Sequence, residues 1–170
     1  EIKDGYSHHN LTEILQYLYE NGLTFWEYVQ EFEDENIWDY LREVLQVMKK
    51  SVEDGLNEEG VLPGGLHLRR KARSYYTKAR SYKPSLKGRC LVQAYALAVS
   101  EQNASGGKIV TAPTCGSCGV VPAVLYHLNT EHEFTEKQIM RSLATAGLIG
   151  NVIKYNASIS GAEVGCQGEV

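Results

Sequence analysis

The chain has 170 residues, a formal net charge of −4 and 43% hydrophobic residues, enough for one domain with its own apolar core. Its longest nearly apolar run, 90–99, is about half the ~18–20 residues that span a bilayer, and no basic-then-apolar signal segment opens the chain. We therefore expect a soluble, cytoplasmic protein. Its four cysteines are expected to be reduced thiols, which leaves metal or cluster binding open.

Charge is divided unevenly along the sequence. Residues 1–60 hold fifteen acidic and four basic residues, whereas 61–100 hold nine basic residues and no acidic one. The basic residues lie within 69–89 and alternate with tyrosines, a pattern that suits phosphate contacts and base stacking. We favour a second interpretation, in which the basic strip 69–89 pairs with the acidic region or faces solvent. A third is that it steers a carboxylate substrate toward a cleft.

Three helices are predicted within the acidic region. Residues 10–13 and 24–27 each place a capping residue three positions before a glutamate, the pattern of a capping box at a helix start. The first helix is expected to end at Gly22, and a third runs from Ile37 and ends at Gly55. The residues expected to face the core in the first two helices are Leu11, Ile14, Leu15, Leu18, Phe25, Val29 and Phe32.

The middle of the chain divides into a basic loop region, 61–84, and a buried helix. The loop region contains a Leu-Pro-Gly-Gly-Leu break and shows no clear apolar period, so we treat 56–84 as loop with one short helix, lying over the site. An alanine-rich helix is predicted from 85 to about 103, with apolar residues around most of its axis. Residues 109–112 have the composition of a strand, but no partner strand is evident and an isolated strand is not stable.

Two further helices are predicted in 85–170, the region we take as a helical core with its site loops. Gly116 or Ser117 caps the first, and Pro122 fits its first turn. The second begins at the capping box 135–138. The residues expected inside are Val120, Val121, Val124, Leu125, Leu128, Ile139, Leu143, Ala146 and Ile149, with Gly147 and Gly150 permitting close helix contact. The predicted fold is all-α, a compact multi-helix domain with glycine-rich site loops.

Cys115 and Cys118 have the spacing of a redox pair or of half a zinc or cluster site. A second ligand pair at matching spacing is missing, and helical flanks do not suit thioredoxin-like chemistry. One interpretation is a tight glycine-containing turn with buried thiols. The other is that the peptide N–H groups of 115–119 lie at a helix start and hold a carboxylate, with the Thr114 hydroxyl as a further donor.

Lysine and histidine chemistry gives weaker signals. Lys108 and Lys154 could each form a Schiff base with pyridoxal phosphate, the cofactor of another class of amino-acid dehydratases, but no α/β pattern supports that alternative. His127 and His132 are five residues apart, which does not place them on one helical face as metal ligands. We interpret the histidines as surface or core residues.

The last fifteen residues, 156–170, combine glycines with small polar side chains around one cysteine. Asn156, Ser158 and Ser160 offer hydrogen-bonding groups that a packed interior would have to satisfy. A thiolate at Cys166 would be a soft metal ligand or a nucleophile. This composition suits a site better than a core, with a buried structural cysteine as the alternative.

Three blocks and this terminal stretch carry a resemblance to a known family. The blocks are 59–66, 104–114 and 111–124, and the likeness runs from about residue 22 to residue 170. They resemble the catalytic alpha domain of the iron–sulfur-dependent bacterial L-serine dehydratases, also called L-serine ammonia-lyases. The resemblance implies a lyase that degrades L-serine to pyruvate and ammonia, using a [4Fe-4S] cluster whose open iron acts as Lewis acid.

The same resemblance implies roles for individual residues. Cys166 corresponds to a cluster ligand, and Cys118 is a weaker candidate. Binding of the substrate carboxylate is expected of Thr114 and of the backbone of 115–118, which includes Cys115 and Gly116. Hydrogen bonding to substrate or to the cluster sulfurs is expected of Asn156, Ser158 and Ser160. Position 115 is often Asn in relatives, so we expect the backbone of Cys115, and not its side chain, to bind the substrate. The general base is not identified.

The resemblance also implies partners. These are L-serine as substrate, a beta domain or beta subunit of the same enzyme, and a homo- or hetero-oligomeric assembly, with no nucleic acid and no membrane. The family's beta domain and its other two cluster cysteines have no counterpart in the 170 residues, so we expect this chain alone to be inactive. The alternatives from other classes are a non-catalytic helical module that binds nucleic acid through 69–89 and a regulatory or assembly fragment.

Overall fold

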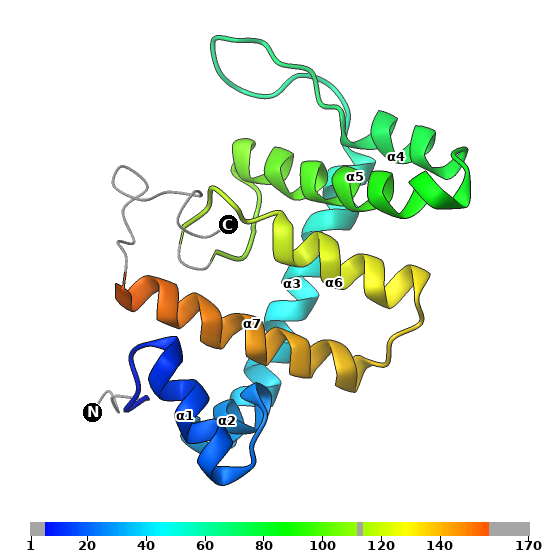
Figure 1. The fold of residues 1–170 in the computed structure, drawn as a ribbon. Coiled ribbons are helices and arrows are strands. Elements are labelled where there is room, and N and C mark those ends of the chain that lie inside the picture. Colours follow the sequence, from blue (N-terminus) through cyan, green and yellow to red (C-terminus); the bar gives the residue numbers. More distant parts are fainter. Residues whose placement is uncertain (1–5, 112–113, 157–170) are drawn as a thin grey trace.

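The computed structural model describes residues 6–111 and 114–156, and this part of the chain folds into helices joined by loops, with no β-strand (Figure 1). The helices are α1 Leu11–Asn21, α2 Phe25–Phe32, α3 Ile37–Asn57, α4 Ala72–Arg80, α5 Pro84–Ala104, α6 Val120–Glu131 and α7 Glu136–Asn156. The all-α prediction is confirmed. No helix in the described ranges is long and apolar enough to cross a membrane.

The predicted capping boxes start the helices as expected. At α1, the Asn10 side chain accepts a hydrogen bond from the Glu13 N–H at 3.0 Å, and the Glu13 carboxylate accepts from the His9 N–H at 3.1 Å. At α2, the Thr24 N–H donates to Glu27 at 2.8 Å. Residues 135–138 start α7 in the same way. Each pairing satisfies backbone N–H groups that a helix start otherwise leaves without partners.

Two hydrophobic clusters form the core. The first core cluster joins α1, α2 and α7 to the first part of α3 and consists of Ile14, Leu18, Tyr28, Val29, Leu41, Leu45, Met48, Leu125, Ile139, Met140, Leu143, Ala144 and Leu148. The second core cluster lies around α5 and consists of Val52, Ala79, Leu91, Tyr95, Val99, Cys118 and Ala123. Helices α3 and α6 contribute to both, so α3 links the α1–α2 end of the molecule to the α4–α5 end (Figure 1).

The closest helix contact is made by Gly55, which does not end α3 as predicted. The helix continues to Asn57, and a Cβ atom added at Gly55 would collide with the backbone carbonyl of Ala98 on α5. Gly147, predicted to permit close contact on α7, has no neighbour within 4 Å of such an atom. Gly55 therefore permits close packing of α3 on α5 and does not end the helix.

The predicted buried faces of α1 and α6 are partly wrong. In α1, Ile14 and Leu18 are buried as predicted, whereas Leu11 and Leu15 are 42% and 48% exposed because they lie on the adjacent face. In α6, Leu125 is buried as predicted and Leu128 is partly buried against the first core cluster, whereas Val120, Val121 and Val124 are exposed and Pro122 and Ala123 are buried in their place. The rotation of α6 follows from the small residues Gly119 and Ala123, which pack against α5. In α7, Ile139 and Leu143 are buried as predicted, and Ala146 and Ile149 are half-buried.

Candidate functional site

The linker between α5 and α6, residues 105–119, carries the first predicted site residues, Thr114, Cys115 and Gly116. A turn starts it: the Gly107 N–H donates to the Gln102 carbonyl at 2.8 Å, and Gly106 has φ 76°, a conformation that favours glycine. A side chain at Gly107 would collide with the Gln102 side chain. Further along, Ile109 packs on the second core cluster and Val110 on the first. Residues 109–111 belong to no strand, and residue 112 lies outside the described ranges.

The turn from Thr114 to Gly119 precedes α6 rather than forming its first turn. The Cys118 N–H donates to the Cys115 carbonyl at 3.4 Å, and the Val120 N–H donates to the Ser117 carbonyl at 2.9 Å. Gly119 is the cap residue, so the helix begins later than the predicted Gly116 or Ser117 start. Because the Cys118 N–H already has a partner inside the turn, only part of the predicted row of N–H donors is available to a carboxylate.

Backbone contacts hold this turn against α5. A Cβ atom at Gly119 would collide with the Ala96 carbonyl, and the Asn103 side chain donates to the Cys115 carbonyl at 3.5 Å. The Thr114 hydroxyl oxygen accepts from the Gly116 N–H at 3.3 Å. This bond holds the Thr114 side chain within the turn.

The two cysteines of the turn lie in different surroundings. Cys118 is 7% exposed and belongs to the second core cluster beside Leu91 and Tyr95. Cys115 is exposed, and neither cysteine forms a disulfide bond within the described residues. The buried-thiol interpretation therefore describes Cys118, and its apolar surroundings do not suit a cluster ligand. In the described part of the chain no three histidine, cysteine, aspartate or glutamate side chains gather so that they could hold a metal ion.

The end of α7 places Asn156, and a contact with the N-terminal segment holds it there. The Asn156 side-chain amide donates to the His9 carbonyl at 2.7 Å and to the Val152 carbonyl at 2.9 Å. The His9 ring stacks on the Tyr155 ring with centroids 4.1 Å apart and planes 6° apart. Asn156 is therefore already engaged in a structural role. Ser158, Ser160 and Cys166 lie outside the described residues.

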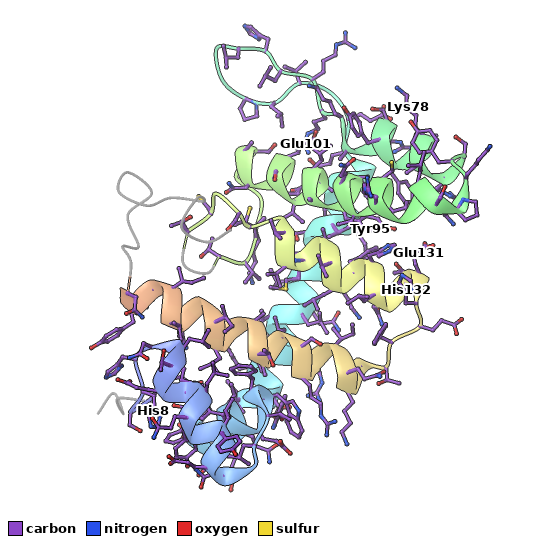
Figure 2. All side chains as sticks on the ribbon, in the orientation of Figure 1. His8, Lys78, Tyr95, Glu101, Glu131 and His132 are labelled. Carbon is purple, nitrogen blue, oxygen red and sulfur yellow. The ribbon has the colours of Figure 1, made fainter. Side chains whose placement is uncertain are left out.

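An aromatic group anchors the N-terminal segment to α1 and α2. His8, labelled in Figure 2, lies 2.8 Å from the Tyr28 hydroxyl, and the Tyr6 hydroxyl donates to Glu33 at 2.6 Å. Burial raises the pKa of Tyr28 to about 12, and burial together with Glu33 raises the pKa of Tyr6. Apart from Asn156, the residues that hold the end of α7 in place were not predicted to be functional from the sequence. The capping box after His9 was the available local signal that this segment is ordered.

Two residues of the basic strip 69–89 pair with the acidic region, in line with the favoured interpretation. Arg70 pairs with Glu58 at 2.6 Å and Arg73 pairs with Glu59 at 3.0 Å. The Arg70 side chain is 7% exposed, so its charge faces the protein. This arrangement favours intramolecular pairing over a nucleic-acid surface for this part of the strip.

The start of α4 is fixed from α5. Glu101, labelled in Figure 2, is buried and accepts from the N–H groups of Lys71 and Ala72 at 2.6 and 3.2 Å. The carboxylate satisfies two backbone donors at a helix start and complements the positive end of the helix dipole. The basic loop region is thereby connected to the helix that also supports the α5–α6 linker.

The remaining candidates do not assemble into a site. Lys108 and Lys154 are exposed, which does not suit a Schiff-base lysine that must hold a cofactor in a pocket. His127 and His132 come together at the end of α6 with ring centroids 5.1 Å apart, because the chain turns back after the helix. Burial and the neighbouring His132 lower the pKa of His127. This pair is a contact that helical spacing alone did not predict.

Comparison with known proteins identifies the family. The family model of the serine dehydratase alpha chain matches residues 9–170. An L-serine dehydratase of Streptomyces coelicolor is 44% identical over 165 residues, covering 93% of this chain and 36% of the relative. One of Haemophilus influenzae is 42% identical, covering 99% and 39%, and L-serine dehydratase 1 of Escherichia coli is 40% identical, covering 100% and 40%. The chain spans about two-fifths of these relatives' length. It belongs to the serine dehydratase alpha chain family.

Proposed function

We propose that the enzyme containing this chain is an L-serine ammonia-lyase, which dehydrates L-serine to aminoacrylate that then yields pyruvate and ammonia. The observation that carries the proposal is the family match over residues 9–170, supported by relatives named L-serine dehydratase. The α5–α6 linker adds a structural argument. Its Thr114–Gly116 turn is accessible and is held on α5 by backbone contacts, which suits a rigid support for a small polar substrate.

In this proposal the Thr114 turn binds the substrate carboxylate. The Thr114 oxygen accepts from the Gly116 N–H, which holds this side chain in place within the turn. Cys115 contributes through its backbone, which Asn103 holds by its carbonyl. Asn156, Ser158 and Ser160 are proposed to hydrogen-bond substrate or cluster sulfur. For Asn156 the oxygen of the side-chain amide is the available atom, because its nitrogen donates to the His9 and Val152 carbonyls.

The proposed cofactor is a [4Fe-4S] cluster with Cys166 as the ligand from this chain. When bound, such a cluster supplies an iron Lewis acid for departure of the substrate hydroxide. Cys118 does not fit as a ligand, because its sulfur lies in the second core cluster. We therefore keep Cys166 and remove Cys118 from the proposed ligand set.

We further propose that activity needs a part of the enzyme beyond these 170 residues. The chain spans about two-fifths of the length of the relatives, which supports a separate beta domain or subunit and leaves room there for the unassigned base. We place the enzyme in the cytoplasm as an oligomer. The pairing of Arg70 and Arg73 with glutamates weakens the nucleic-acid alternative.

The direct test is pyruvate formation from L-serine by the intact enzyme, purified without oxygen and compared with an air-exposed sample. The proposal expects activity that is lost in air together with a broad visible absorbance of the cluster. Air-stable activity with a pyridoxal absorbance would support Schiff-base chemistry instead. An inactive enzyme in both samples, with iron present, would overturn the proposed reaction.

A further inference from the structure

A cavity of about 450 Å³ lies between α2, α3 and α7 and takes no part in the proposed reaction. Its volume is within the range of small-molecule sites, about 300–1,000 Å³. Trp26 and Trp38, the two tryptophans of the chain, both line it. Their rings are 6.3 Å apart and tilted by 56°, and both pack on the first core cluster while staying partly exposed. Two indole rings therefore offer an apolar surface to whatever enters.

The charged residues of the cavity are unequally paired. Arg42 is held by Asp39 at 2.6 Å and by Glu136 at 3.2 Å. Lys137 and Arg141 also line the cavity, and neither forms an ion pair with a carboxylate in the described part of the chain. This is unexpected beside a region with fifteen acidic residues. Arg141 interacts electrostatically with Glu27 without forming an ion pair, and both cations face a cavity whose one carboxylate among the described residues, Glu136, is paired with Arg42.

Arg141 is oriented by an aromatic contact. Its guanidinium carbon lies 3.9 Å from the centroid of the Trp26 ring, a stacked arrangement that leaves the N–H groups at the guanidinium edge free to donate. Lys137 lies in the first turn of α7, where the helix dipole also favours a negative group. The two cations and the two indole rings are therefore contributed to one cavity by three helices.

We propose that this cavity binds a small organic anion with an aromatic body, of the arylalkyl carboxylate class. The carboxylate is held by Arg141 and Lys137, and the ring lies against Trp38 and against the part of Trp26 that Arg141 does not cover. Charge-assisted hydrogen bonds fix the anionic end, and stacking on the indoles adds affinity for a flat apolar body. L-serine has no such body, so this site is independent of the proposed reaction.

Tryptophan fluorescence of the 170-residue chain tests the proposal, because both reporters lie in this cavity. The probe is 3-phenylpropionate, excited at the red edge of tryptophan absorption, where a phenyl ring does not absorb. The neutral comparison is 3-phenylpropan-1-ol. We expect a saturable change in emission with the anion and about tenfold weaker binding of the alcohol, since a charged hydrogen bond contributes about 1.5–3 kcal/mol.

Lys137→Gln and Arg141→Gln should each weaken binding of 3-phenylpropionate by about tenfold. Arg89→Gln is the matched control, because it removes one charge from an exposed position on α5 outside the cavity. Lys137→Gln is decisive, since Arg141→Gln also alters the surroundings of Trp26. The proposal is overturned by the absence of a saturable change, by equal binding of acid and alcohol, or by Lys137→Gln binding as tightly as Arg89→Gln.

Discussion

The α5–α6 linker and the end of α7 both lead to proposed site residues, yet they are held by opposite means. The linker lies against α5 mainly through glycines whose missing side chains allow close approach, Gly119 to the Ala96 carbonyl and Gly107 to the Gln102 side chain, and Asn103 adds one hydrogen bond. The end of α7 is held by side chains, Tyr155 on the His9 ring and Asn156 on the His9 carbonyl. A contact that depends on a missing side chain fails when an atom is added, whereas a side-chain contact fails when atoms are removed.

The largest effect is expected from adding one methyl group to the linker. In Gly119→Ala the new Cβ collides with the Ala96 carbonyl, which is backbone and cannot rotate away. Overpacking of this kind costs about 1–3 kcal/mol, so the free energy of unfolding in denaturant should fall by that amount. In the intact enzyme the displaced 114–119 turn should also abolish most L-serine turnover.

Gly147→Ala is the matched control for that substitution. Gly147 is inside α7, is exposed and has no neighbour near the position of a Cβ atom. The same change should therefore stabilise the chain by about 0.5–1 kcal/mol, because alanine has the higher helix propensity. If both variants unfold at the same denaturant concentration, the linker is not positioned by its contact with α5.

A second prediction separates the function of the linker from its packing. Thr114→Ala in the intact enzyme should raise KM for L-serine about tenfold, since a hydrogen bond to a charged group contributes about 1.5–3 kcal/mol. Thr114→Ser keeps the hydroxyl and should retain most of the affinity. Steady-state kinetics of the two variants decide the matter. An equal KM for both would remove Thr114 from the substrate site.

The N-terminal segment, which holds the end of α7, packs on Tyr28 through His8. The contribution of Tyr28 to stability can be tested by measuring the free energy of unfolding at different pH values. Burial raises the pKa of Tyr28 to about 12, so between pH 10 and 12 the unfolded chain loses this proton first. The stability contributed by protonated Tyr28 is complete below about pH 10 and is lost as the pH rises toward 12. The free energy of unfolding should therefore fall by about 1 kcal/mol from pH 9 to pH 11.

Tyr28→Phe should reduce that dependence, because it removes the titrating group while keeping the ring. Tyr95, in the second core cluster, has its pKa raised by burial to about 12 as well, so Tyr95→Phe is the matched comparison. Denaturant titrations at both pH values give the slopes. An unchanged slope in Tyr28→Phe would show that the hydroxyl titrates as it does in the unfolded chain.

The features of the fold that could be predicted from the sequence are those that depend on groups close together along the chain. Capping boxes start α1, α2 and α7 because each involves groups three or four residues apart. The predicted buried face of α6 holds for Leu125 but fails for its three valines, because the rotation of the helix depends on how closely Gly119 approaches Ala96, a contact across 23 positions of sequence. Gly55 was read as a helix stop for the same reason, since its partner Ala98 belongs to another helix.

The candidate site shows the same limit. The glycine-rich turn at 114–119 was recognised from composition, and the apolar surroundings of Cys118 agree with one of its two interpretations. Gln102 was not recognised, although it is buried and its side-chain nitrogen has no hydrogen-bond partner within residues 6–111 and 114–156. The role of His9 in holding the end of α7 could not be predicted from local sequence, because its ring stacks on Tyr155 and its carbonyl accepts from Asn156, both far away in the sequence.

The smallest expected effect concerns the fastening of α7. Asn156→Ala removes the donors to His9 and Val152; an exposed hydrogen bond contributes about 0.5–1 kcal/mol, so the free energy of unfolding should fall by no more than that. Asn151→Ala, at an exposed position on the same helix, is the control. The rate of hydrogen exchange at the amides of residues 9 and 155 should rise only in Asn156→Ala, because losing a side-chain contact loosens the structure locally. Loss of the contacts between the linker and α5 would instead affect the whole linker. If the intact Asn156→Ala enzyme instead shows a raised KM with exchange as slow as in Asn151→Ala, then Asn156 binds substrate and does not fasten the helix.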